Sequence, residues 1–93
     1  MRWIADVHVQ LRPGIADPEG LTIASGLRSL GFAGVQQVRS GKLVRIAFEA
    51  EDPTAADDAI ATMCRRLLAN PVMEVASWDL RADEEPASEE QLA

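Results

Sequence analysis

The chain contains few of the residues that catalytic sites and disulfide scaffolds require. Its single cysteine, Cys64, allows no internal disulfide, which excludes a secreted disulfide-rich domain. Its single histidine, His8, has no second histidine with which to form a metal site or an acid-base pair. We therefore expect His8 on the outer face of a strand and Cys64 in the core. Two Trp, two Phe and no Tyr are too few aromatic residues for an RNA-binding sheet.

Negative charge is concentrated at the end of the chain. The formal net charge is -6, but five of the fifteen acidic residues follow residue 82, and residues 1–81 carry nine basic and ten acidic groups. A nearly neutral body offers no broad electrostatic surface for nucleic acid or an anionic membrane. The sequence also shows no signal peptide and no apolar run of membrane-spanning length. We therefore expect a cytoplasmic protein with neither kind of partner.

Two Asp-Pro steps, Asp17-Pro18 and Asp52-Pro53, stand 35 residues apart. In each step the Asp carboxylate can accept a hydrogen bond from the free N–H groups that open a helix. The Pro fits the first helical position, where no N–H is needed. Each step follows an alternating, strand-like run and precedes apolar residues at helical spacing, so the chain is predicted to contain a doubled strand-helix-strand unit.

Residues 3–11, 43–50 and 72–80 alternate strongly enough to predict strands, and residues 35–40 alternate weakly and are expected to form an edge strand. The two helices are predicted to end at Gly31 and at Asn70-Pro71. The resulting order is that of an α+β, ferredoxin-like βαββαβ sandwich over residues 1–81. It implies a four-stranded antiparallel sheet of order 4-1-3-2 with two helices on one face. Residues 82–93 are expected to be an acidic, disordered tail.

The sheet face without helices is predicted to be only partly polar, which favours a homo-oligomer over a monomer. It should carry Ile4, Asp6, His8, Gln10, Leu43, Arg45, Ala47 and Glu49.

The polar residues suggest binding rather than catalysis. The acidic pairs Glu51-Asp52 and Asp57-Asp58 are explained by the dipole of the second helix. The residues alone leave open an ACT-like module that senses a small ligand, or a small enzyme of the acylphosphatase type. The enzyme would use Arg12 for an anion, but Asn70, its one possible asparagine, stands at a helix end.

The exact residues of four segments indicate a protein family more specifically than their apolar periodicity does. The segments are VQLRPGIADPEG (9–20), LGF (30–32), VRSGK (38–42) and CRRLLANPVME (64–74). Through these segments, in order along residues 2–81, the chain closely resembles the PurS family, the small subunit of phosphoribosylformylglycinamidine synthase.

This resemblance implies a subunit with no catalytic site, metal or cofactor of its own. Such a subunit dimerises and bridges a glutaminase subunit and an ATP-dependent synthetase subunit during ammonia transfer in de novo purine biosynthesis. ATP, Mg and glutamine are then used by the partner subunits.

If the resemblance holds, docking surfaces are expected at three places: the loop of residues 12–20, the hairpin around Lys42 and the turn at Asn70-Pro71. Around that hairpin, Arg39, Lys42 and Arg45 form the one local basic cluster, which suits either a solvated tip or contact with an acidic partner surface. The candidate docking residues are Arg12, Pro13, Gly14, Asp17, Arg39, Lys42, Asn70 and Pro71. The ACT-like sensor remains the alternative function.

Overall fold

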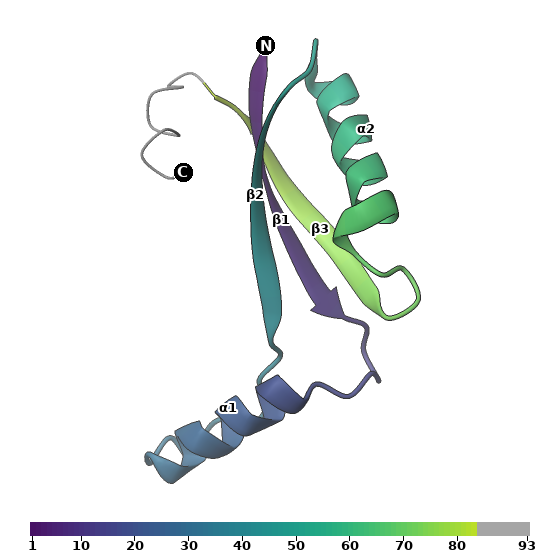
Figure 1. Cartoon of the computed structure of the whole chain (residues 1–93). Coiled ribbons are helices and arrows are strands. Elements are labelled where there is room, and N and C mark those ends of the chain that lie inside the picture. Colours follow the sequence, from purple (N-terminus) through teal and green to yellow (C-terminus); the bar gives the residue numbers. More distant parts are fainter. Residues whose placement is uncertain (84–93) are drawn as a thin grey trace.

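A three-stranded antiparallel sheet forms the centre of the molecule in the computed structural model, which describes residues 1–83 (Figure 1). Its central strand is β1 (Arg2–Leu11), which pairs with β2 (Gly41–Glu49) on one side and with β3 (Glu74–Ala82) on the other. Val7 lies opposite Val44 and Trp78 in these two pairings. Three of the predicted strands are thus confirmed, although the last begins at Glu74 and not at residue 72.

One face of the sheet is covered by α2 (Pro53–Met63), which continues into the single π-helical turn η1 (Cys64–Leu68). Ile60 and Cys64 pack there against Ala5, Val7 and Val9, and all five side chains are buried. The predicted core position of Cys64 is confirmed, and burial raises the pKa of its thiol. The protein therefore uses this cysteine as a small apolar residue rather than as a nucleophile.

Both Asp-Pro steps begin helices as predicted. In α1 (Pro18–Ser29) the N–H of Gly20 donates to Asp17 at 2.9 Å, and in α2 the N–H of Ala55 donates to Asp52 at 2.7 Å. Gly31 ends α1 with φ of +100°, and the N–H of Phe32 donates back to the carbonyl of Leu27 at 3.0 Å. This is a Schellman ending, which places an apolar residue after the helix against its last turn.

The predicted fourth strand is wrong. Within residues 1–83 the sheet has the order β2-β1-β3, and residues 35–40 form no strand. Their backbone groups bond elsewhere: Arg28 donates to the carbonyls of Val35 and Gln36 at 2.9 and 3.1 Å. The N–H of Ser40 donates to Asp17 at 2.7 Å. Because these backbone groups form hydrogen bonds with side chains, the segment follows α1 and does not pair with β2.

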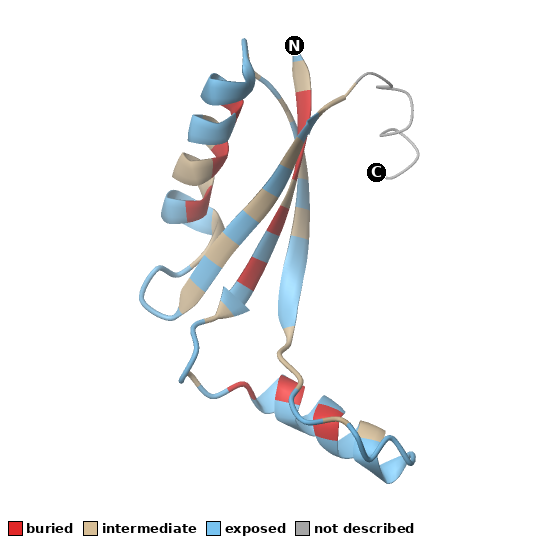
Figure 2. Cartoon of the chain, turned by 180° about the vertical axis from the view of Figure 1, so that it is seen from behind, coloured by how far each residue is buried: buried red, intermediate tan, exposed pale blue. Residues whose placement is uncertain are grey.

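The expectation of two helices on one face is also wrong for a single chain. Helix α2 lies on the sheet, whereas α1 projects from the end of the sheet at which β1 ends and β2 begins (Figure 1). Figure 2 shows that most of α1 is exposed; its buried residues are Gly20 and Ala24, and Gly20 lies against the carbonyl of Val38 in the segment that follows the helix. The predicted acidic tail, residues 82–93, lies outside the described residues except for Ala82 and Asp83.

The opposite sheet face carries the polar residues predicted for it. The carboxylate of Asp6 on β1 accepts from Arg45 on β2 at 2.6 Å and from Arg81 on β3 at 2.9 Å, so one side chain ties all three strands together. These contacts, chiefly the hydrogen bond from Arg45, lower the pKa of Asp6 to about 2. His8 lies on the same face, 3.4 Å from Asp79, as an outward-facing strand residue.

Candidate docking surface

The loops at one end of the sheet gather all eight predicted docking residues. They come from the segment after β1, the start of β2 with the residues just before it, and the turn before β3, three stretches that antiparallel pairing with β1 brings to the same end (Figure 1). The predicted surface is therefore one region rather than three separate ones. Within this region, which we call the loop end, buried and exposed residues have different roles.

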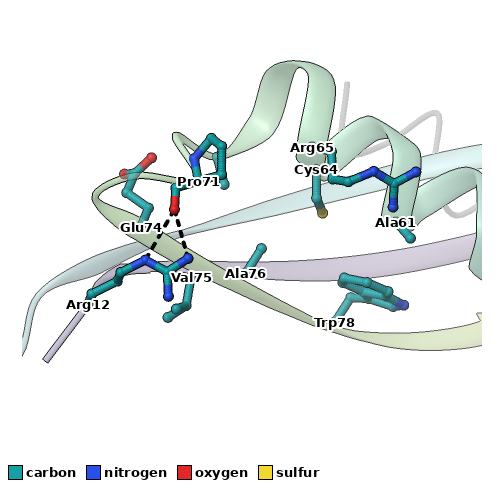
Figure 3. A pocket seen from close by; sticks show the side chains of 10 residues that line it. Arg12, Ala61, Cys64, Arg65, Pro71, Glu74, Val75, Ala76 and Trp78 are labelled. Carbon is teal, nitrogen blue, oxygen red and sulfur yellow. Dashed lines mark hydrogen bonds between the residues drawn. The ribbon is translucent and has the colours of Figure 1, made fainter.

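Arg12 connects the first loop to the last turn. Its Nε and Nη2 donate to the carbonyl oxygen of Pro71 at 3.1 and 2.7 Å (Figure 3), and its backbone N–H donates to the carbonyl of Met73 at 2.8 Å. Two candidate residues that are 59 positions apart are thus in direct contact. The guanidinium is exposed, so its remaining donors face solvent.

Pro13 and Gly14 form an exposed turn beside Arg12. The N–H of Ile15 donates to the carbonyl of Arg12 at 3.0 Å, and Gly14 has φ of +88°. Pro at the second position and a left-handed Gly at the third are typical of a type II turn. The backbone of this tip is therefore fixed although its residues contact solvent.

Asp17 is a buried acidic residue, with 6% of its surface exposed. Its carboxylate accepts from the N–H groups of Gly20 at 2.9 Å and Ser40 at 2.7 Å, and these two hydrogen bonds lower its pKa. The side chain of Ser40 also donates to Glu19. Asp17 thereby joins the start of α1 to the start of β2, which makes it a structural residue rather than an exposed docking residue.

Gly20, which the sequence alone did not explain, is required by this junction. A Cβ atom there would collide with the carbonyl oxygen of Val38 and lie 2.7 Å from the Asp17 carboxylate. Only glycine allows α1 and the returning segment to come this close.

In the structure, the three residues of the predicted basic cluster lie in different surroundings. Arg39 is half-buried and donates to the carbonyls of Leu11, Arg12 and Ile15 at 3.1, 3.2 and 3.3 Å. Arg45 belongs to the opposite sheet face, where it is paired with Asp6. Lys42 is exposed at the loop end, and within residues 1–83 it has no ion-pair partner. Of the three, Lys42 remains as a candidate for contact with an acidic partner.

The last turn presents apolar side chains that sequence reasoning missed. Asn70 Oδ1 accepts from the N–H of Val72 at 3.0 Å, and this turn leaves Val72 and Met73 79% and 43% exposed. The signal in the sequence is the pair of apolar residues directly after Asn-Pro, which the alternation of residues 72–80 predicts to be part of the last strand. With Arg12 and Pro71 they form an exposed patch of mixed character, as protein interfaces often do.

A groove of about 300 Å³ lies next to this turn, between α2, η1 and β3 (Figure 3). Its floor is apolar, and polar groups lie at its rim. The side chains that line it include those of Arg12, Cys64, Arg65, Glu74, Val75 and Trp78.

The geometry gives the enzyme alternative no support. Arg12 is bound to a backbone carbonyl and Asn70 closes its own turn, so they do not converge on an anion. No cluster of three or more His, Cys, Asp or Glu residues suited to a metal ion occurs in residues 1–83. Nor is any helix in this part of the chain long and apolar enough to cross a membrane.

Comparison with known proteins identifies the family. Residues 4–82 match the family model for PurS, phosphoribosylformylglycinamidine (FGAM) synthase. The chain belongs to the PurS family. It is 44% identical over 76 residues to the PurS subunit of Synechocystis, a match covering 82% of this chain and 76% of that one. The PurS subunit of Archaeoglobus fulgidus is 48% identical over 71 residues, covering 76% of this chain and 89% of that one.

Solved PurS structures share the fold. PurS of Thermus thermophilus superposes with a TM-score of 0.81 and 38% identity, covering 89% of this chain and 99% of the other. A chain in the structure of PurLQS from Thermotoga maritima superposes with a TM-score of 0.76 and 31% identity over the same shares of the two chains. The fold of this chain is therefore shared with experimentally solved PurS chains.

Proposed function

We propose that this chain is the non-catalytic small subunit of phosphoribosylformylglycinamidine synthase, bridging a glutaminase subunit and an ATP-dependent synthetase subunit in purine biosynthesis. The observation that carries the proposal is the family match over residues 4–82. It is supported by the PurLQS structure, whose name places a PurS chain of the same fold in an assembly with PurL and PurQ. In this proposal ATP, Mg and glutamine bind the partner subunits, and the complex works in the cytoplasm.

A bridging subunit accelerates ammonia transfer without chemistry of its own. Ammonia released into solution is diluted and protonated before it reaches a second active site. Two active sites held in fixed register keep the effective concentration of the nucleophile high. The ten-residue strand β1 and its two neighbours provide a stiff scaffold for this purpose.

The loop end is the surface that we assign to docking. Its turns are fixed by the Arg12–Pro71 contact and by the bonds of Arg39 and Asp17 to the backbone. Its exposed residues are thus presented without the entropic cost of ordering a flexible loop. We also infer that the working form is a homo-oligomer, because β2 and β3 are both open edges within the described chain.

Charge reversal at Lys42 tests the docking assignment. Mixed with the glutaminase and synthetase subunits, the Lys42→Glu variant should assemble about tenfold more weakly than wild type, as expected for a charged interface contact. Glutamine-dependent amidine formation should fall with assembly, whereas ammonia-dependent formation by the synthetase should not change. Glu51→Lys is the matched control, since Glu51 is exposed near the opposite end of β2.

Each result decides a separate point. Normal assembly of Lys42→Glu would remove Lys42 from the docking surface. Failure of the wild-type chain to co-elute with either subunit in size-exclusion chromatography would overturn the bridging role. Saturable thermal stabilisation by one free amino acid, without such assembly, would instead favour the ACT-like sensor.

A further inference from the structure

The groove beside the last turn carries positive charge at its rim. Arg12 and Arg65 both line it and both are exposed, and Figure 3 shows them toward opposite ends of the groove. Within residues 1–83 neither side chain has an ion-pair partner. Glu74 also lines the groove, but its carboxylate accepts from the backbone N–H of Asn70 at 2.7 Å. The rim therefore has guanidinium donors available for an acidic ligand.

The floor between these two arginines is apolar. It includes Cys64, Ala76 and the ring of Trp78, whose indole N–H donates to Asp57, a residue outside the lining, at 2.8 Å. The groove is bordered by η1, in which the N–H of Ala69 donates to the carbonyl of Cys64 at 3.1 Å. Single π-helical turns of this kind often occur at functional sites. The groove suits a segment that carries carboxylates next to an apolar side chain.

The chain has a segment of this chemistry after β3. Residues 84–93 contain no Lys or Arg, and they include the acidic pairs Glu84-Glu85 and Glu89-Glu90, followed by Leu92. The family match ends at residue 82, and the superposition on Thermus thermophilus PurS covers 99% of that chain but 89% of this one. The acidic segment is therefore an addition to the shared fold, and its charge is complementary to that of the rim.

The segment is long enough to reach the groove. Trp78 lies five positions before Asp83 on β3, a distance of about 17 Å at 3.3 Å per residue. Glu89 follows Asp83 by six positions and can reach about 20 Å in an extended chain, and Leu92 can reach about 30 Å. Because β3 is an edge strand in the described sheet, no other strand stands between its end and the groove.

The covalent connection favours this segment over an acidic peptide from solution. A single exposed ion pair changes a binding constant by less than about fivefold, so a free peptide would bind the rim weakly. A segment connected by a few residues has an effective concentration on the order of millimolar at the groove. Weak contacts are therefore sufficient to keep it there.

We propose that residues 84–93 turn back along the free edge of β3 and bind in this groove of their own chain. Glu89 and Glu90 pair with Arg65, and Leu92 packs on the apolar floor toward Arg12. This contact goes beyond the proposed function and does not depend on it. Since Arg12 and Pro71 also belong to the loop end, the bound segment covers part of the docking surface, and a partner that docks there has to displace it.

A spin label in the full chain tests the contact. The Gln91→Cys variant is labelled with a nitroxide, and the wild-type chain controls for labelling of buried Cys64. In nitrogen–proton NMR spectra, the backbone signals of Ala61 and Ala76 and the indole signal of Trp78 should lose most of their intensity. The signal of Arg45, on the opposite sheet face, should not. The lost intensity should return in about 1 M salt, where the screening length is about 3 Å.

Charge variants of the labelled chain separate a specific contact from general attraction. Glu89→Gln with Glu90→Gln should restore the groove signals. Glu84→Gln with Glu85→Gln is the matched control, because it removes the same charge from residues that reach only about 7 Å beyond Asp83. On the other side of the contact, Arg65→Gln should restore the signals. Arg66→Gln should not, because Arg66 is exposed on η1 but does not line the groove.

The outcomes decide both the contact and its location. Groove signals that keep their intensity, or equal effects of the two glutamate pairs, would overturn the proposal. Loss of groove signals from unlabelled chains refolded together with spin-labelled ones would place the segment in the groove of another copy and would also overturn it.

A second measurement tests whether the segment covers the docking surface, and this one rests on the proposed function. The full chain with Glu89→Gln and Glu90→Gln should bind the glutaminase and synthetase subunits a few-fold more tightly than wild type. Equal binding would overturn the covering of the loop end. Absence of binding by both chains would count against the bridging role itself, which the spin-label experiment does not require.

Discussion

The two helices begin with the same Asp-Pro device but differ in what they bury. In α2 the apolar face, including the fully buried Ile60, packs on the sheet. In α1 the buried residues are Gly20 and Ala24, whereas Leu21 and Ile23 are exposed. Local sequence is thus sufficient to start and stop a helix, whereas the segments that connect it to the sheet decide where it packs.

The connections explain the difference. Helix α2 follows β2 after a short turn, and its returning turn is held close to β1 by the Arg12–Pro71 bonds. Residues 18–40, which comprise α1 and the segment after it and which we call the α1 arm, are held at their base by bonds from side chains to backbone groups, and these bonds direct the arm away from the sheet. One helix therefore stabilises its own chain, and the other is available to a second protein surface.

Truncation of Ile60 should have the largest effect on stability. Ile60→Ala leaves a cavity in the cluster between α2 and β1, and the free energy of unfolding should fall by about 3 kcal/mol in urea denaturation. Leu67→Ala is the control, because Leu67 is 84% exposed on η1 and its truncation should change stability by less than about 0.5 kcal/mol. Equal losses of stability for both variants would show that α2 does not pack on β1 through Ile60.

Substitution of Gly20 should have a smaller effect, directed at the arm. Gly20→Ala places a methyl group against the Val38 carbonyl and the Asp17 carboxylate, and overpacking of this kind should cost about 2 kcal/mol. Gly26 lies on the same helix, where an added Cβ atom would meet nothing within 4 Å. Gly26→Ala should therefore stabilise the helix by about 0.5–1 kcal/mol.

Thermal unfolding of Gly20→Ala and Gly26→Ala measures the difference in stability between the two variants directly. If Gly20→Ala were as stable as Gly26→Ala, the close approach of α1 to residues 35–40 would not exist in solution. Loss of the homo-oligomer in Gly20→Ala but not in Gly26→Ala would further connect the base of the arm to self-association.

Much of the fold could be predicted because its signals are local. The Asp17 and Asp52 caps, the Gly31 ending and the alternation of residues 3–11 each depend on neighbours within a few positions, and the structure confirms them. The arm could not be predicted in this way. Its direction depends on Arg39 and the carbonyls of Leu11 to Ile15, and such side-chain-to-backbone bonds leave no periodic pattern.

The geometry of the loop end could be predicted only in part, for the same reason. Turn residues such as Pro13 and Gly14 are recognisable locally, but the contact between Arg12 and Pro71 spans 59 positions. Three basic residues close in sequence were interpreted as one cluster. Arg39 precedes β2 and bonds to the carbonyls of the loop after β1, whereas Arg45 lies within β2 and bonds to Asp6 on the neighbouring strand.

The sheet and the base of the α1 arm each depend on one carboxylate, and acid should weaken both regions. Asp6 ties three strands through Arg45 and Arg81, whereas Asp17 ties the base of the arm through backbone N–H groups. Both pKa values are lower in the folded chain than the usual 3.8, that of Asp6 being about 2. A lowered pKa gives stability that is present above about pH 4 and is lost as the pH falls through the folded-state value.

Asp6→Asn measures the contribution of the sheet carboxylate separately. It should lower the free energy of unfolding by about 1 kcal/mol at pH 7, a value reduced for partial solvent screening of the ion pairs. Between pH 4 and pH 2 the difference between Asp6→Asn and wild type should shrink, because Asp6 becomes protonated in wild type as well. Asp79→Asn on the same face is the control, since its side chain is 82% exposed. A difference that stays constant through acid would mean that the carboxylate charge of Asp6 does not hold the strands together.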